Sequence, residues 1–253
     1  MQATDVLQSL FRWIHVVTGI LWIGMLYFFN WVNGPFMATL DGETKKKVVP
    51  ELMPRALFWF RWGAAFTWVT GVLLLLLVFY HEGAAFEGTK GPNPAAWASL
   101  AIVFVSPFFY DALVKGPLSK SPRAPALFGV FIVAGLTYLM AHQAGFGFRG
   151  YVIHIGAMFG TIMAFNVWFR IWPAQQKIIT AVKAGTPPDA ALVAMAGARS
   201  KHNTYMSIPL VLAMLNAHST WMASQWWIFT VAVAVAWIGT QHLYKKAAKV
   251  KGF

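Results

Sequence analysis

Long apolar runs, separated by short polar stretches, dominate the chain. Seven of these runs are long enough to cross the ~30 Å hydrocarbon layer of a bilayer, which takes about 20 helical residues. The runs lack the strict alternation of apolar and polar residues that marks the strands of a membrane barrel. We therefore predict an all-α, polytopic integral-membrane bundle of seven transmembrane helices, forming one domain over residues 1–253. The predicted helices cover residues 7–32, 56–80, 95–114, 124–142, 149–172, 204–222 and 225–244.

The longest polar stretch, residues 173–203, has the pattern of short amphipathic helices. Polar and apolar residues interleave up to Lys183, the Gly-Thr-Pro-Pro sequence at 185–188 interrupts the pattern, and a second helix is expected to begin near Asp189. Helices of this kind lie in the interface between lipid and water. We expect the segment to lie on the cytoplasmic face of the membrane.

The composition supports a bilayer as the main partner of the chain. Hydrophobic residues make up 58% and charged residues 11%, whereas a soluble domain carries about 25% charged residues. The chain has no cysteine, which excludes disulfides, thiolate metal sites and covalently attached c-type haem within it. The net charge of +12 does not point to nucleic acid, because no basic stripe with interleaved aromatic residues lies outside the apolar runs.

The basic residues predict the orientation of the helices. Sixteen of the 20 Lys and Arg residues fall in segments 33–55, 115–123, 170–203 and 245–251, which share one side if seven helices alternate. Arg12, Lys90 and Arg149 fall on the other side, and Arg61 lies inside the second run. Cytoplasmic loops carry the excess of positive charge. We therefore expect a multi-pass protein of the bacterial inner membrane with its N-terminus outside and its C-terminus in the cytoplasm.

Histidines are the candidate chemical groups inside the bilayer. On the predicted topology five of the seven lie in the outer half, and His202 and His242 lie toward the cytoplasm. Ionisable side chains in hydrocarbon are costly and usually functional, and imidazole is a ligand for haem iron and copper. The five outer histidines are His15, His81, His142, His154 and His218.

His15 and His154 are the favoured axial ligands of a b-type haem, with His218 in reserve. They lie about eight and five residues into helices that enter from the same side, which predicts depths differing by only about 4–5 Å. Arg12 and Arg149 lie at a suitable height to bind haem propionates. The alternatives remain open at this point, because both histidines also suit hydrogen-bonded packing positions and both arginines also suit snorkelling to the headgroups.

Other metal and ion sites are weaker alternatives. His154 with Met158 and His218 with Met214 have the i, i+4 spacing and the ligand types of a copper site, although Met is also an ordinary packing residue. His202 and His242 are candidates for a second haem on the cytoplasmic side. The acid nearest to a predicted span, Asp111, precedes Lys115 by four residues, which indicates a structural ion pair rather than an ion pathway.

Three stretches of the chain resemble the bacterial membrane-bound urate oxidases, also called urate hydroxylases. They are RWIHVVTGILWIGMLYFFNWVN (12–33), GAMFGTIMAFNVWFRIWPAQQKII (156–179) and SKHNTYMSIPLVLAMLNAHSTW (200–221). The resemblance implies oxidation of urate to 5-hydroxyisourate, with electrons passed to a c-type cytochrome. The positions that match the family are His15, His154, His202, Asn203, Tyr205, Asn216 and His218.

The chain departs from this family at its C-terminal end. Family members usually continue through another helix into a cytochrome c domain, whereas this sequence ends at Phe253 without any cysteine. We therefore expect the c-type cytochrome to be a separate chain. The alternative is a non-catalytic electron-transfer or structural subunit of a larger membrane redox complex.

Overall fold

The computed structural model describes residues 3–88, 91–120, 124–216 and 221–250. Within these residues the chain folds into nine α-helices with short π-helical and 3-10 segments between them. The helices are α1 (Ala3–Tyr27), α2 (Gly34–Thr39), α3 (Gly42–Leu74), α4 (Pro94–Lys115), α5 (Ala124–His142), α6 (Phe148–Asn166), α7 (Trp172–Lys183), α8 (Ala190–Leu215) and α9 (Trp226–Ala247).

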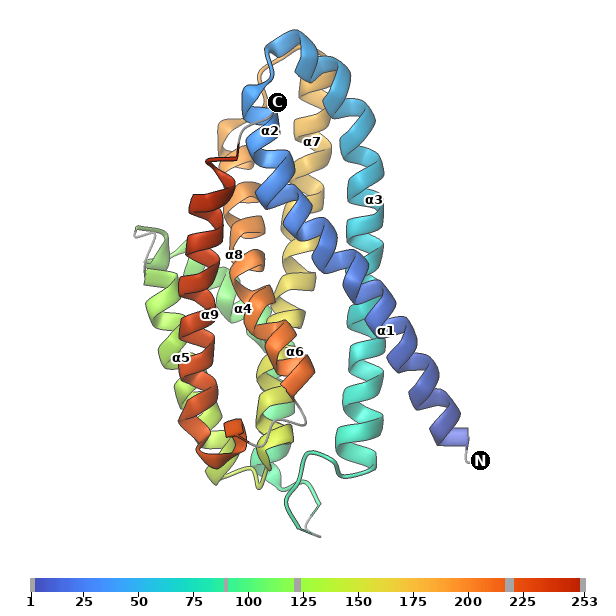
Figure 1. Cartoon of the computed structure of the whole chain (residues 1–253), viewed down its shortest axis with the longest axis vertical. Coiled ribbons are helices and arrows are strands. Elements are labelled where there is room, and N and C mark those ends of the chain that lie inside the picture. Colours follow the sequence, from blue (N-terminus) through green and yellow to red (C-terminus); the bar gives the residue numbers. More distant parts are fainter. Residues whose placement is uncertain (1–2, 89–90, 121–123, 217–220, 251–253) are drawn as a thin grey trace.

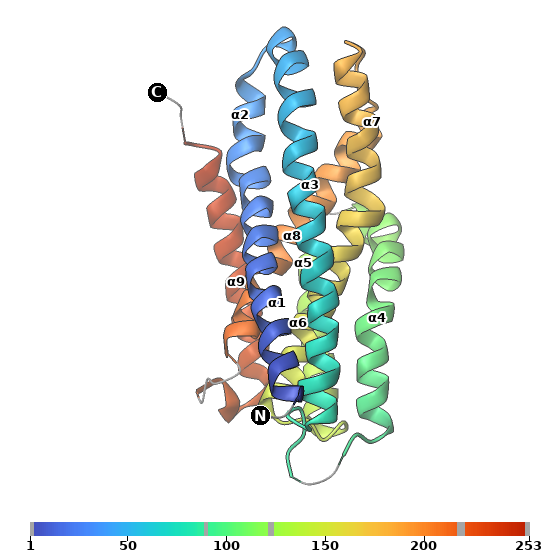
Figure 2. The same cartoon turned by 90° about the vertical axis from the view of Figure 1, so that its right-hand side faces the viewer.

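Three π-helical segments join or extend α-helices into long continuous rods. Phe28–Asn33 joins α1 to α2, Leu75–His81 extends α3, and Val167–Ile171 joins α6 to α7. The rods have 36 to 40 residues, so at 1.5 Å per residue they are about 54–60 Å long, nearly twice the thickness of the hydrocarbon layer. In Figure 2 the tips of α3 and α7 accordingly project well beyond the upper end of α4.

The predicted fold class is confirmed. Six helices in the described part of the chain are long and apolar enough to cross a membrane, and α8 is a seventh long helix whose first half is more polar. The prediction is closest for the shorter helices: the run 124–142 coincides with α5, and the run 95–114 differs from α4 by one residue at each end. The run 204–222 covers only the second half of α8, which begins at Ala190.

The segment 173–203 differs from the expected pair of helices lying on the membrane surface. α7 continues the rod of α6 outward, and α8 begins on this side and returns into the bundle (Figure 1). The turn between them contains Gly185, with φ +72°, and Asp189 caps α8 by accepting a hydrogen bond from the amide of Ala191 at 2.8 Å. The predicted start of a helix near Asp189 is therefore correct, but the helices form a projecting hairpin.

The two ends of the bundle differ in charge. The N-terminus lies at one end and the C-terminus at the other (Figure 1). The beginning of α3, the end of α7, the beginning of α8 and the end of α9 all lie at the upper end in that view. These segments carry most of the sixteen basic residues, so we call this end the basic end and the other the N-terminal end.

The core of the bundle is centred on α6. Thirteen of the 19 residues of α6 are buried, against two of the 25 residues of α1. α6 packs closely on α8, because a Cβ atom at Gly156 would lie 2.9 Å from Cβ of Ala213 and one at Gly160 would lie 3.3 Å from Cδ1 of Leu210. These glycines are therefore helix-packing positions.

Candidate functional site

His154 is completely buried near the N-terminal end. Its Nδ1 donates to the carbonyl oxygen of Gly150 at 2.7 Å, and its Nε2 lies 2.9 Å from the hydroxyl of Tyr80. The ring stacks on Phe146 with a centroid distance of 4.4 Å. The Tyr80 hydroxyl also lies 3.0 Å from the carbonyl oxygen of Ala96. Both ring nitrogens of His154 are therefore occupied, and aromatic packing encloses the ring.

His15 is half-buried and is bonded through one nitrogen. Its Nδ1 lies 2.9 Å from the carbonyl oxygen of Thr67 and 3.3 Å from Oγ1 of Thr70. The ring lies against Gly71, where a Cβ atom would be 2.9 Å from Cε1 of His15. Donation from Nδ1 to a carbonyl fixes the tautomer and leaves the lone pair of Nε2 available, as in many metal-binding histidines.

The structure does not bring His15 and His154 together. His15 contacts α3 at Thr67 to Gly71, whereas His154 contacts the same rod at Tyr80. These contact points are nine to thirteen residues apart, which corresponds to about 14–20 Å along the helix axis. A haem clamped between these two histidines does not fit this arrangement.

The remaining outer candidates lie on the surface or outside the described residues. Arg12, His81, His142 and Arg149 are exposed. His218 lies outside the described residues. The part of the chain that the structure describes contains no group of three or more His, Cys, Asp or Glu residues suited to a metal ion.

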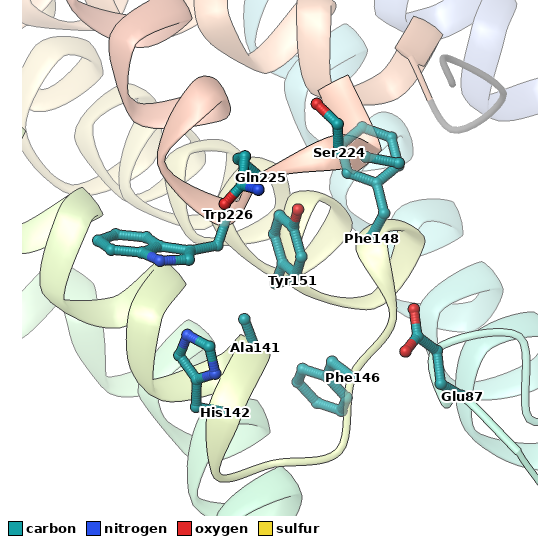
Figure 3. Close-up of a pocket in the computed structure, with 10 residues that line it drawn as sticks. Glu87, Ala141, His142, Phe146, Phe148, Tyr151, Ser224, Gln225 and Trp226 are labelled. Carbon is teal, nitrogen blue, oxygen red and sulfur yellow. The ribbon is translucent and has the colours of Figure 1, made fainter. Parts of the chain in front are cut away.

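His142 lines an open cavity of about 230 Å³ at the N-terminal end (Figure 3). It packs against Tyr138 at a centroid distance of 4.5 Å and lies near Trp226 at 6.3 Å. Figure 3 shows Glu87 on the opposite side of the cavity from His142, and Gln225 beside Trp226 and Tyr151. Residues 223–226, before and at the start of α9, form one wall of this cavity.

A network of charged residues connects α4, α8 and the rod of α6 and α7 at the basic end. Asp111 of α4 accepts hydrogen bonds from Arg170 at 2.9 and 2.5 Å and from Arg199 at 2.6 Å, and it pairs with Lys115 at 2.8 Å. The predicted pair of Asp111 and Lys115 is therefore confirmed. Arg199 is almost fully buried, with 3% of its side chain exposed. One carboxylate faces three cations, so the group carries excess positive charge.

Uncharged polar side chains extend this network into the bundle. The Tyr110 hydroxyl lies 2.8 Å from Nδ1 of His202, and the Asn166 amide donates to Oδ1 of Asn203 at 2.8 Å. Asn203 in turn donates to the carbonyl oxygen of Met163 at 3.0 Å. Asn166 also donates to the Tyr110 hydroxyl at 3.4 Å. His202, which is partly buried, and Asn203, which is fully buried, were both expected as site residues and thus lie in one hydrogen-bonded cluster.

A second set of hydrogen bonds connects α8 to the first rod, which consists of α1 and α2, and to α9. The amide of Asn30 donates to Oγ of Ser200 at 2.8 Å, and the Tyr244 hydroxyl donates to Oδ1 of Asn30 at 2.8 Å. Tyr205 stacks on Tyr244, with ring centroids 5.9 Å apart and an interplanar angle of 12°. The three stretches quoted above, far apart in the sequence, therefore all supply polar side chains to the basic end.

A cavity of about 260 Å³ lies beside this branch, between the first rod, α3, α7 and α8. Its polar lining residues include Asn33, Gln175 and Ser200, and its aromatic lining residues are Phe29 and Phe60. The sequence analysis did not select Asn33 or Gln175 as candidate site residues. For Asn33, the feature that could have indicated a site is the pair of asparagines, Asn30 and Asn33, near the end of an otherwise apolar run.

Comparison with known families identifies the group to which this chain is related. The family model described as urate oxidase N-terminal matches residues 34–252, which is most of the chain. The chain belongs to the urate oxidase N-terminal family. No curated protein and no solved structure matches it.

The matched range includes most of the basic-end network. Two of the three stretches that resemble urate oxidases, 156–179 and 200–221, lie inside it, and the stretch 12–33 precedes it. Asp111, Arg170, Arg199 and Asn203 all fall within the matched range. Two other candidate residues of this urate oxidase family member do not join the network. Asn216 donates to the carbonyl oxygen of Leu212, one turn earlier in the chain, at 3.0 Å, and His242 is exposed on α9.

Proposed function

We propose that this chain is a membrane-embedded oxidoreductase that oxidises urate and passes the electrons to a c-type cytochrome on a separate chain. The supporting observation is that residues from both matched stretches meet in one buried polar network, joined there by Tyr110 and Asp111 of α4. Buried polar groups are costly unless they are paired, and those inside membranes usually serve a function. The bacterial inner membrane, with the basic end in the cytoplasm, is the proposed location.

The reaction sets a stoichiometry that can be measured. Conversion of urate to 5-hydroxyisourate takes one oxygen atom from water and releases two electrons and two protons. The purified, detergent-solubilised protein is therefore expected to reduce two molecules of added cytochrome c for each urate consumed, without forming hydrogen peroxide. The variant His81→Ala, which changes an exposed histidine at the N-terminal end, should retain this activity. Absence of urate-dependent reduction would favour a non-catalytic subunit instead.

A b-type haem is the cofactor that we propose, held without covalent attachment because the chain has no cysteine. Such a group supplies one-electron transfer. His15 is the favoured ligand, because its Nδ1 is anchored on Thr67 and its Nε2 has no hydrogen-bond partner among the described residues. No reaction step is assigned to a haem between His15 and His154, since the two do not face one another.

A reduced-minus-oxidised spectrum with pyridine haemochrome analysis tests the cofactor. We expect a b-type spectrum that is lost in His15→Ala and retained in His81→Ala. Loss in His154→Ala with retention in His15→Ala would instead assign the ligand to His154. More than one iron per chain would support a second haem near His202 and His242, although His202 Nδ1 is occupied by Tyr110 and His242 is exposed.

A further inference from the structure

The cavity at the N-terminal end is lined by aromatic rings and by one acidic side chain (Figure 3). The rings are those of Phe146, Phe148, Tyr151 and Trp226, and the acid is Glu87. None of the described residues that line the cavity is Lys or Arg. An anion would therefore face a carboxylate here, whereas a cation would meet a charge of opposite sign.

Backbone hydrogen bonds hold Glu87 beside the start of α6. The amide of Glu87 donates to the carbonyl oxygen of Gly145 at 3.3 Å, and the amide of Gly147 donates to that of Ala85 at 3.0 Å. A Cβ atom at Gly147, the N-cap residue of α6, would lie 3.0 Å from Oε1 of Glu87. Glu87 forms no ion pair with another described residue. Its charge is thus held at the rim of the cavity and is available to a ligand.

The aromatic rings surround the cavity from several sides. Phe148 and Tyr151 lie one turn apart on α6, with ring centroids 5.6 Å apart and an interplanar angle of 86°. Phe146 and Tyr151 are almost fully buried, and Figure 3 shows Trp226 across Tyr151 from Phe148. The face of an aromatic ring attracts cations, and sets of such rings bind quaternary ammonium groups. A volume of about 230 Å³ enclosed in this way suits one small organic cation.

We propose that this cavity binds the ammonium group of an organic cation, with its alkyl groups against the rings and Glu87 as its counter-charge. A metal ion suits the cavity less well, because it needs several oxygen ligands and most of the lining is aromatic. The cavity lies where α5 ends and where α6 and α9 begin. At the end of a membrane bundle, the ammonium group can come from a dissolved amine or from the head of a zwitterionic phospholipid. The proposal does not depend on the oxidation of urate.

The test is equilibrium binding of choline to the full chain in dodecyl maltoside, a detergent without an ammonium group. A buffer of about pH 8 lies above the usual pKa of histidine, so that an imidazole such as that of His142 adds no positive charge. The comparison is with dimethylbutanol, the uncharged analogue in which carbon replaces the nitrogen of choline. We expect choline to bind at least about tenfold more tightly. Equal affinities would show that the cavity only buries apolar surface and would overturn the proposal.

Two variants test the rings and the carboxylate separately. Phe148→Leu removes one ring and should weaken choline binding about tenfold, whereas Phe131→Leu, at an exposed position of α5 outside the cavity, should have no effect. Glu87→Gln changes an exposed side chain, so the protein should remain folded, and choline binding should weaken about threefold. Its control is Glu82→Gln, because Glu82 is an exposed acid that accepts a hydrogen bond from Gln8. Unchanged choline affinity in folded Phe148→Leu or in Glu87→Gln would overturn the proposal.

Binding of labelled choline to the protein in vesicles assigns the source of the ammonium group. If the natural occupant is a lipid head, vesicles of phosphatidylcholine should abolish choline binding, and vesicles of phosphatidylglycerol, which has no ammonium group, should preserve it. If choline binds in both kinds of vesicle, the occupant is a dissolved cation. Both results support an ammonium site, whereas loss of choline binding in both kinds of vesicle would overturn it.

Discussion

The two ends of the bundle satisfy their buried polar groups in different ways. At the N-terminal end, His15 and His154 each bond to a backbone carbonyl, and His154 is further enclosed by Tyr80 and Phe146. At the basic end, side chains bond to one another across helices. Bonds to the main chain fix single side chains on the backbone, whereas bonds between side chains make several helices depend on one another.

The largest loss of stability is expected for Asp111→Asn at the basic end. The substitution leaves Arg199 buried without its counter-charge, and breaking a buried pair in this way costs about 3–5 kcal/mol. We expect the melting temperature in detergent to fall by roughly 10 °C. The control is Glu51→Gln, because Glu51 and Arg55 form a pair in which both side chains are more than 70% exposed. Similar melting temperatures for the two variants would contradict the importance of the network.

At the N-terminal end the corresponding large effect should come from a backbone contact. A methyl group on Gly150 would overlap the carbonyl oxygen of Ala85, which is itself held by the amide of Gly147. We expect Gly150→Ala to destabilise the protein by about 3 kcal/mol, the upper part of the usual range for overpacking. Gly135→Ala in α5, where nothing lies within 4 Å of the new Cβ atom, should be neutral or slightly stabilising in the same thermal unfolding experiment.

A smaller effect is expected for Asn203→Ala. This substitution removes the acceptor of Asn166 and the donor to Met163, so buried polar atoms lose their partners at a cost of about 2 kcal/mol. Thermal unfolding compared with Asn216→Ala measures the difference, because Asn216 bonds only to a carbonyl of its own helix. If Asn216→Ala proves equally destabilising, the cross-helix links contribute no special stability.

The smallest effect is expected for Tyr80→Phe at the N-terminal end. His154 keeps its bond to the Gly150 carbonyl, so the loss of the hydroxyl should cost only about 1 kcal/mol. The control is Tyr138→Phe, an exposed tyrosine on α5 that packs beside His142. A loss of stability in Tyr80→Phe as large as in Asp111→Asn would remove the distinction between the two ends.

The sequence predicts the helices better than it predicts their lengths. An apolar run ends where the helix ends in α4 and α5, so these boundaries were accurate. The rods continue past the hydrocarbon layer as polar helices, where no apolar run remains to be counted. Counting residues from the start of a run also predicts similar depths for His15 and His154, because it treats α1 as parallel to α6. Figure 1 shows that α1 runs obliquely across α3.

The candidate site was predictable only where the chemistry is local. Asp111 and Lys115 are one helical turn apart, so their pairing follows from spacing. Arg170 and Arg199 bond to Asp111 although they are 59 and 88 residues away in the sequence. A single sequence does not show which residues so far apart lie close together in the fold. His202 and Asn203 were placed among the candidates through the family resemblance, whereas Asn33 and Gln175 carried too little signal to be chosen.

The π-helical segment Val167–Ile171 lies between a residue of the network, Asn166, and a residue of the cavity, Gln175. A π-helical turn holds one residue more than an α-helical turn. Deleting a single residue there would restore a regular α-helix, and α7 would keep nearly the same face toward the bundle, because the wider turn absorbs the extra residue. Deleting a residue from a regular α-helical part of the same rod before α7 would instead rotate α7 by about 100°. Gln175 would then leave the cavity while every side chain of α7 kept its identity. The wide turn therefore marks the place along this rod where the architecture tolerates a change in chain length.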